Sequence, residues 1–188
     1  MSDVIDNDGF RANVGIVLMR ADGCVFLGRR TGGRGWQFPQ GGMRHGETLE
    51  QALYRELHEE VGLVREDVTI AGRTADWVRY RLPPRYIRRK SQPVCVGQKQ
   101  RWFLLRLARE DAAFRLDATG EPEFDQWRWC GYWEPVREVI YFKRPVYVQA
   151  LTELGPIGFP AGVPATPQWW AEITASAVSA DQPTESVG

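Results

Sequence analysis

Cysteine is scarce in this chain of 188 residues, which has only three. Cys24, Cys95 and Cys130 lie far apart, and no two of them form a Cys-x-x-Cys pair. A disulfide framework or a structural zinc site normally needs paired or clustered cysteines. Their absence argues against both and favours a reducing compartment, so we expect a cytoplasmic protein.

Long apolar segments are also missing. No run approaches the roughly 20 residues of a membrane-spanning helix. The acidic N-terminus, MSDVIDNDGF, lacks the apolar stretch of a secretory signal. Net charge is absent as well, since 24 basic side chains balance 24 acidic ones. We therefore expect no membrane association, and the overall charge indicates no partner.

The chain does contain enough apolar material for one domain, with 43% hydrophobic and 12% aromatic residues. Alternating or apolar runs predict strands at 13–19, 24–29, 68–70, 74–80, 94–96, 101–107 and 125–130. Helices are expected at 48–61 and within 136–154, where Pro145 must lie at a start or a break.

From residue 155 the composition changes to Gly, Pro, Ala, Ser and Thr. We therefore predict a domain over 1–154 and a loosely ordered tail over 155–188. The pair Trp169-Trp170 is the exception, because two neighbouring indoles are expected to dock on the domain or on a partner.

The helix predicted at 48–61 has an unusual distribution of acids. At about 100° per residue, Glu56 and Glu60 fall within the apolar stripe of the helix and Glu59 falls beside it. Glutamate runs on helices usually face solvent, which is the alternative interpretation. Buried carboxylates at this spacing would repel one another and lose hydration. A divalent cation such as Mg²⁺ or Mn²⁺ removes both costs. Arg55 is placed to orient Glu59 at i+4, or to form an ordinary surface ion pair.

A motif covers this helix and the loop before it. From Gly41 the chain reads GGMRHGETLEQALYRELHEEVGL. This matches the Nudix box, G-x5-E-x7-R-E-U-x-E-E-x-G-U with U apolar, at Gly41, Glu47, Arg55, Glu56, Leu57, Glu59, Glu60, Gly62 and Leu63. The chain thus resembles the Nudix hydrolases. The resemblance implies an α/β Nudix fold, in which a mixed β-sheet is sandwiched between helices (α/β/α).

In Nudix hydrolases the acids of this motif bind the metals that bridge the substrate's phosphates. Carried over, Glu56 and Glu60 are expected as direct ligands and Glu59 as a further ligand, with Gly41 in the same metal site. Mg²⁺ is the implied cofactor, and Mn²⁺ or another divalent cation can substitute. Arg55 joins Glu56 and Glu60 in the catalytic set.

Two further acids belong to this scheme. Glu47 is expected to stabilise the junction between loop and helix. Glu56 is the first candidate for the general base, but Glu123 in EPEFD is another acid that can serve as base or metal ligand. Without the resemblance, Glu123 is equally well explained as a polar loop residue.

The flanking segments WQFPQGG, GFRANVGIVL, PVCVGQKQRWFLL, EPEFDQWRW and YFKRPVY resemble those of bacterial RNA pyrophosphohydrolases and (di)nucleoside polyphosphate hydrolases, over about residues 8–154. The former remove pyrophosphate from 5′-triphosphorylated RNA, and the 5′-monophosphate left behind favours mRNA decay. The implied substrate contacts are Arg11 and Arg30 on phosphates or a base edge, Gln98 on the RNA end, and the pair Phe142-Lys143 on a base and a phosphate. The plainer alternatives are a core phenylalanine and solvated arginines.

The same residues are also consistent with other functions. Hydrolysis of Ap4A- or Ap5A-like dinucleotides would use the same helix. A non-catalytic Nudix-fold binding module would be expected to lack one of the box acids, all of which are present. The basic stretch 79–90 either guides an RNA backbone or is a soluble loop. The sequence indicates neither a DNA partner nor a particular protein partner.

Overall fold

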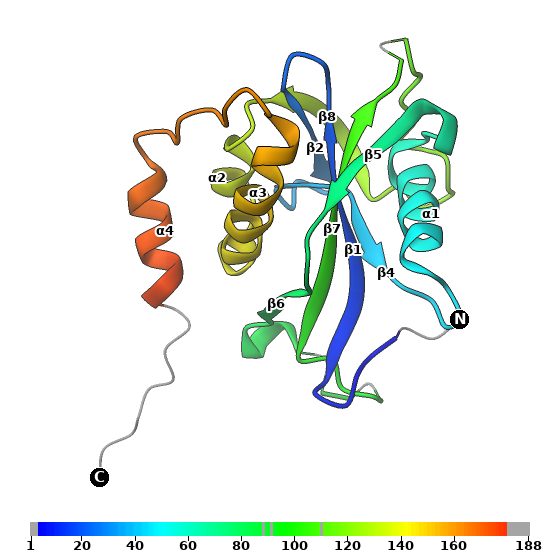
Figure 1. Ribbon diagram of the computed structural model, residues 1–188. Helices are drawn as coiled ribbons and strands as arrows, with labels where there is room; N and C mark the ends of the chain where they lie inside the picture. The colour runs from blue at the N-terminus through cyan, green and yellow to red at the C-terminus, as the bar shows by residue number, and fades with distance from the viewer. Residues whose placement is uncertain (1–3, 88, 91, 110, 180–188) are drawn as a thin grey trace.

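A mixed β-sheet forms the centre of the molecule, with helices on both faces (Figure 1). The structure is a computed structural model that describes residues 4–87, 89–90, 92–109 and 111–179. Its strands are β1 (Phe10–Met19), β2 (Val25–Arg30), β3 (Trp36–Gln37), β4 (Gln40–Gly42), β5 (Val68–Arg73), β6 (Val78–Arg81), β7 (Gly97–Leu107) and β8 (Phe124–Cys130). Its α-helices are α1 (Leu49–Val61), α2 (Glu134–Glu138), α3 (Arg144–Gly158) and α4 (Trp170–Ser179). The predicted α/β/α arrangement is confirmed.

The sheet is organised around β1. This strand pairs in parallel with β7 along its whole length, from Phe10 opposite Gly97 to Met19 opposite Arg106. It pairs antiparallel with β2 and β4, while β2 also pairs with β3 and β8, and β7 with β5 and β6. Because β1 and β7 are parallel and in register, their first residues meet at one end of the sheet and their last residues at the other.

Both faces of β1 are covered, which explains its nearly continuous apolar sequence. Val14, Ile16 and Leu18 pack into the core under α1. Val17 and Met19 alternate with them and pack into the second core, beneath α3. All five side chains are buried, so the strand holds the two layers together.

Helix α1 begins and ends as its sequence predicts. The Thr48 hydroxyl accepts from the Gln51 amide at 3.2 Å, and the Gln51 side chain accepts from the Thr48 amide at 2.8 Å, which completes a capping box. Gly62 ends the helix with a positive φ of 76°. A side chain there would be strained and would also collide with Arg115, whose carbonyl oxygen lies 2.6 Å from the position of an added Cβ.

Several strand predictions need correction. Residues 94–96 are irregular, and the strand that was expected there begins instead at Gly97. Residues 74–77 lie outside β6, because the Thr74 hydroxyl and amide bond to the backbone of Trp102 and bend the chain before Val78. Strands β3 and β4 were not predicted, since two or three residues are too few to show a period.

The chain beyond residue 154 also differs from the expectation. Helix α3 starts with Pro145 in its first turn and continues to Gly158, and α4 follows. Trp170 packs on Trp133 with ring centroids 4.8 Å apart, and the Trp133 indole donates to the Pro164 carbonyl at 2.8 Å. Phe159, Trp169, Trp170 and Ile173 thus pack against the apolar core of the domain, whereas most other residues of 156–175 are exposed. Residues 180–188 lie outside the described residues.

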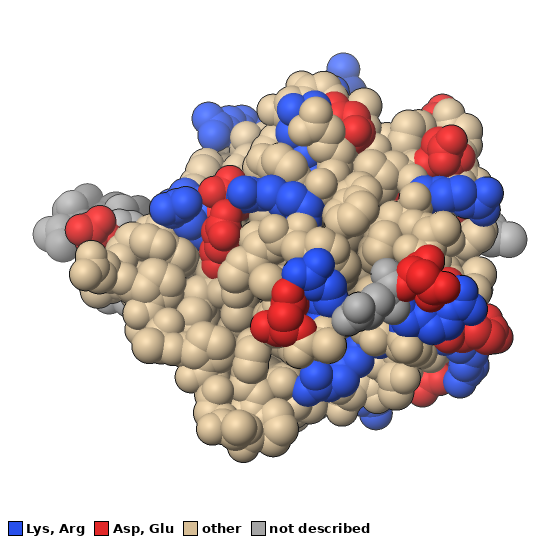
Figure 2. All heavy atoms as spheres, turned by 90° about the horizontal axis from the view of Figure 1, so that it is seen from above, with Lys and Arg blue, Asp and Glu red and all other residues tan. Residues whose placement is uncertain are grey.

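Charges of both signs are interspersed on the face seen in Figure 2, and a wide part of that face carries none. This agrees with the zero net charge of the chain. Within the described ranges, no helix combines the length and the apolar character needed to cross a bilayer.

Candidate active site

Two glycines of β4 allow charged side chains to approach the sheet closely. A Cβ added to Gly41 would lie 1.9 Å from the carboxyl carbon of Glu56, and one added to Gly42 would lie 2.2 Å from a guanidinium nitrogen of Arg11. No side chain fits in either place. The two glycines therefore let the Glu56 carboxylate and the Arg11 guanidinium approach the backbone of β4.

The acids of α1 lie where the helical periodicity placed them. Glu56 and Glu60 are each only 7% exposed, and Glu59 is half-buried. The backbone amide of Gln40 donates to Glu60 at 2.9 Å. Burial, followed by repulsion from Glu56, raises the pKa of Glu60 well above its usual value, and the Gln40 bond only partly opposes this. Burial likewise raises the pKa of Glu56, against the hydrogen bond from Arg55.

Arg55 holds the surrounding carboxylates in place. It binds Glu47 in bidentate fashion at 2.7 and 2.8 Å, and donates to the Gly42 carbonyl at 2.8 Å. It also contacts Glu56, and it reaches Glu59 at 3.2 Å as the i+4 spacing predicts. The hydrogen bonds from Arg55 are the main cause of the lowered pKa of Glu47. Arg55 thus joins the helix to the loop that precedes it.

A cleft of about 530 Å³ opens beside these acids, at the end of the sheet where β1 and β7 begin. It gathers nine of the predicted site residues, namely Gly41, Glu56, Glu60, Glu123, Arg11, Arg30, Gln98, Phe142 and Lys143. Arg55 and Glu59 do not line it, because both are held behind Glu56 by the contacts just described. Side chains from segments far apart in the sequence therefore share one cavity.

Basic side chains also line the cleft. Lys143, in the short 3-10 helix η3 (Tyr141–Lys143), is buried and donates to the Gln37 side chain at 3.1 Å. Burial, then repulsion from Arg30, lowers the pKa of Lys143 to about 8, so the amine is largely charged at neutral pH. Arg30 pairs with Glu123 at 2.8 Å. Acidic and basic side chains therefore line the same cleft.

The arrangement of the acids bears on metal binding. Among the residues the structure describes, no three His, Cys, Asp or Glu side chains are arranged so that they could hold a metal ion. Glu59 is paired with Arg44 at 3.1 Å and with Arg55, and Glu123 is paired with Arg30. Glu56 and Glu60 still fit a cation, because their carboxylates are buried, repel each other and face one cavity.

Three amide residues that sequence reasoning missed, Asn13, Gln37 and Gln40, line the cleft, and the buried Gln100 lies next to them. Asn13 and Gln100 both donate to the side-chain oxygen of Gln98 at 3.3 Å, which leaves Gln98 able to donate from its amide nitrogen. Gln40 accepts from Gln100 at 3.4 Å. A signal for Asn13 was present, since it and Arg11 are the only polar side chains in β1.

Aromatic rings complete the cleft. Phe142 packs on the apolar core, as its plainer interpretation expected, but it also lines the cavity. Its ring lies 5.9 Å from that of Tyr80 and 5.1 Å from that of Tyr86. Tyr80 and Tyr86 were not predicted as site residues, because a single sequence does not show which tyrosines come together.

Sequence comparison supports what the fold and the acid-lined cleft indicate. Residues 9–150 match the NUDIX domain. The chain therefore belongs to the Nudix family, whose hydrolases act on phosphoanhydrides and generally need divalent cations. It is 58% identical to the RNA pyrophosphohydrolase of Alkalilimnicola ehrlichii, over 87% of this chain and 91% of that protein. It is 57% identical to the RNA pyrophosphohydrolase of a Shewanella species, over 80% of this chain and 86% of that protein.

Solved structures agree on the fold. The E. coli dihydroneopterin triphosphate pyrophosphohydrolase superposes with a TM-score of 0.59 at 22% identity, covering 75% of this chain and 94% of that one. A C. elegans Ap4A hydrolase superposes with a TM-score of 0.55 at 19% identity, covering 80% and 95%. At such low identities these likenesses concern the fold alone.

Proposed function

We propose that this protein is a metal-dependent hydrolase that removes pyrophosphate from the 5′-triphosphate end of RNA. The observation that carries the proposal is the cleft, in which buried carboxylates face cationic side chains next to an accessible phenylalanine ring. The high identity to RNA pyrophosphohydrolases over most of the chain supports the same substrate. The 5′-monophosphate product would expose the transcript to decay in the cytoplasm.

The two buried acids of the cleft suit Mg²⁺, for which Mn²⁺ or another divalent cation can substitute. Glu56 and Glu60 would hold the metal, with Glu59, Glu123 and the Gly41 backbone as further candidates. When bound, the metal would neutralise the phosphoryl oxygens and acidify the attacking water. Glu59 and Glu123 would first have to leave their arginine partners, which makes them weaker candidates than the two buried acids.

The remaining residues bind and orient the substrate. Arg11, Arg30 and Lys143 would contact the phosphates, while Phe142 would stack on an unpaired base and Gln98 would donate to the RNA end. Water attacks one phosphorus, the phosphoanhydride bond breaks, and pyrophosphate leaves. Glu56 is our first candidate to accept the proton of the water.

The same cleft would also accommodate a dinucleoside polyphosphate, so the decisive test compares the two substrates. Purified protein with Mg²⁺ is incubated with 5′-triphosphorylated RNA and, separately, with Ap5A, and kcat/KM and the released products are measured. We expect pyrophosphate and 5′-monophosphate RNA, with RNA the better substrate. Turnover of Ap5A alone, with the RNA end intact, would overturn the assignment.

A pair of variants on α1 tests whether the cleft is responsible for turnover. Glu56→Gln should lower kcat by at least about a hundredfold, as expected when a ligand or base is lost. Glu50→Gln makes the same change on the exposed side of the same helix and should leave kcat unchanged. Near-normal turnover by Glu56→Gln would contradict the assignment and would favour a non-catalytic binding module.

A further inference from the structure

Exposed apolar side chains gather at the mouth of the cleft. Seven large hydrophobic residues are exposed in the described part of the chain, and three of them meet here: Tyr86 at 41%, Ile140 at 37% and Tyr141 at 47%. Tyr86 belongs to the short helix η2 (Pro84–Tyr86), and Tyr141 begins η3. Single exposed apolar residues are ordinary, but a cluster beside a binding cleft indicates a contact surface.

An arginine connects the two tyrosines. The guanidinium carbon of Arg85 lies 5.0 Å from the ring centroid of Tyr86 and 6.0 Å from that of Tyr141. One of its nitrogens donates to the Tyr141 hydroxyl at 3.4 Å. Both rings also contact Phe142, at 5.1 and 5.4 Å. Arg85, Tyr86 and Tyr141, the tyrosine platform, thus continue the aromatic surface of the cleft outwards.

The segment that contributes Arg85 and Tyr86 to the platform is basic, which suits a nucleic-acid backbone. Arg85, Arg89 and Lys90 are exposed, and Asp76 is the only acid in the sequence between Arg73 and Arg101. Aromatic rings interleaved with cations suit unpaired RNA, because bases stack on the rings while cations attract phosphates. A folded protein partner fits less well, since three apolar side chains fall far short of the roughly 800 Å² that each partner buries in a stable interface.

We propose that the tyrosine platform binds the unpaired nucleotide that follows the base at Phe142. Its base stacks on Tyr141, and its phosphate lies near Arg85. This inference rests on the proposed function and extends it, because it adds a base contact and a phosphate contact outside the cleft. Tyr141 does not line the cleft itself, so its contribution can be separated from that of the cleft.

A length series of substrates tests the proposal. The full chain with Mg²⁺ is given 5′-triphosphorylated oligonucleotides of one to six nucleotides, and kcat/KM is measured for each. We expect a rise of about tenfold at the length that first reaches the platform, within the range that stacking of one base produces. Tyr141→Ala should abolish this rise and leave the shorter substrates unaffected, whereas Tyr141→Phe, which keeps the ring, should preserve it.

Arg85→Gln gives an independent measurement on the longer substrates. Loss of one phosphate contact should reduce the slope of log(kcat/KM) against log[salt] by about 0.7 for single-stranded RNA. The proposal is overturned if Tyr141→Ala shows the same rise as the wild type. Equal loss at every length would also overturn it, because Tyr141 would then only support Phe142.

Failure of the proposed function would look different, since no member of the series would be hydrolysed while Ap5A was turned over. In that case binding of a fluorescent 5′-monophosphorylated hexanucleotide, measured by anisotropy, tests the platform directly. About tenfold weaker binding by Tyr141→Ala than by Tyr141→Phe would support it, and equal binding would overturn it.

Discussion

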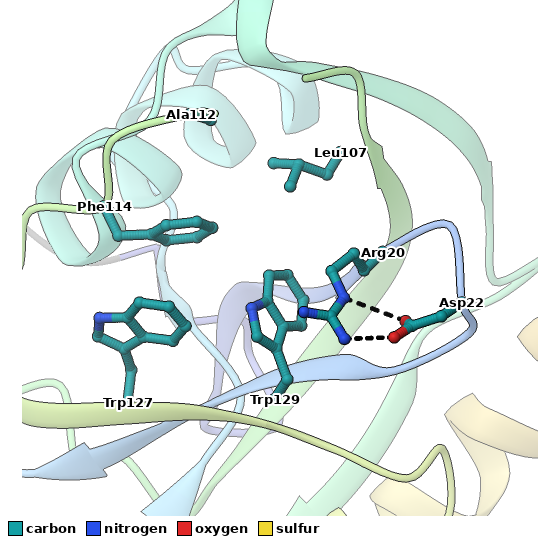
Figure 3. A pocket seen from close by; sticks show the side chains of 7 residues that line it. All are labelled: Arg20, Asp22, Leu107, Ala112, Phe114, Trp127 and Trp129. Atoms are coloured by element: carbon teal, nitrogen blue, oxygen red, sulfur yellow. Dashed lines mark hydrogen bonds and ion pairs between the residues drawn. The ribbon is translucent and has the colours of Figure 1, made fainter. Parts of the chain in front are cut away.

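Two hollows of nearly equal size lie at opposite ends of the sheet. The cleft occupies about 530 Å³ where β1 begins, near Arg11. The aromatic pocket, lined by Arg20, Asp22, Leu107, Ala112, Phe114, Trp127 and Trp129, occupies about 500 Å³ where β1 and β7 end (Figure 3). Their volumes therefore do not distinguish them, and their chemistry does.

In the aromatic pocket every charge is matched. Arg20 and Asp22 form an ion pair with each other, as Figure 3 shows, and the Arg20 guanidinium also lies 5.1 Å from the Trp129 ring centroid. Trp127 stacks on Phe114 with centroids 4.6 Å apart. Ring packing and one satisfied ion pair account for these groups without a ligand.

In the cleft, two carboxylates are buried together, and hydrogen bonds offset only part of the cost of burying their charges. Burial of Glu56 and Glu60, and the repulsion between acids, raise the pKa values of both. A structure without function would gain by replacing them with neutral residues. Incompletely compensated buried charge, rather than cavity volume, is therefore what marks the candidate functional site of this protein.

The largest effect we expect follows from changing one acid to its amide in each hollow. Glu60→Gln should lower kcat on the preferred substrate by at least about a hundredfold, because it removes a charged ligand from the cleft. Asp22→Asn makes the equivalent change in the aromatic pocket and should leave kcat within error. Steady-state kinetics with Mg²⁺ measures both. Comparable losses in the two variants would show that the distinction between the hollows is wrong.

A smaller effect is expected from removing a ring of the aromatic pocket. Trp127→Ala loses the stacking on Phe114 and Phe26, but the side chain is already 37% exposed. We expect a loss of about 1–2 kcal/mol in the free energy of unfolding, below the 3–5 kcal/mol typical of a fully buried aromatic residue such as Phe38. Urea denaturation of Trp127→Ala and Phe38→Ala measures the difference.

The activity of these two variants sharpens the comparison further. Trp127→Ala should retain wild-type kcat/KM under conditions in which it is fully folded. A selective loss of kcat/KM on RNA, with stability nearly intact, would instead make the aromatic pocket part of the substrate path.

How well a feature could be predicted from the sequence depends on whether neighbouring or distant residues determine it. Glu56 and Glu60 were placed correctly because a helix has a fixed period and the acids interrupt its apolar stripe. Thr48 and Gly62 fixed the ends of α1 through local hydrogen bonds and a positive φ, which a sequence encodes directly. Such features depend on neighbouring residues only.

Other features depend on contacts between distant segments. Tyr80 and Tyr86 reach the cleft because β6 pairs with β7, which no local pattern reveals. The same holds for the segment after residue 154, whose composition is typical of a loose tail although Trp170 docks on Trp133. Long-range packing overrides composition there.

The smallest effect we expect is a gain in stability, and it tests the comparison most directly. In EDTA, Glu60→Gln should melt above the wild type, by about 3 °C for each kcal/mol of relieved repulsion. Its amide oxygen can still accept the hydrogen bond from Gln40, while the buried charge is gone. Asp22→Asn should not gain stability, because it loses an ion pair.

The difference in Tm between Glu60→Gln and the wild type should depend on pH, and the pKa of Glu60 gives its direction. The folded-state pKa of Glu60 is raised above the usual carboxyl value of 4.5, so folding favours its protonated form. The free energy that the buried Glu60 charge costs the folded protein is therefore largest above the folded-state pKa. This cost disappears as pH falls through that value towards 4.5. The difference in Tm between Glu60→Gln and the wild type should shrink over the same interval, and saturating Mg²⁺ at neutral pH should reverse it, because only the wild type binds the metal tightly. A wild type that melts above Glu60→Gln in EDTA at every pH would mean that the Glu60 carboxylate is already compensated within the protein, and the contrast between the two hollows would no longer rest on charge.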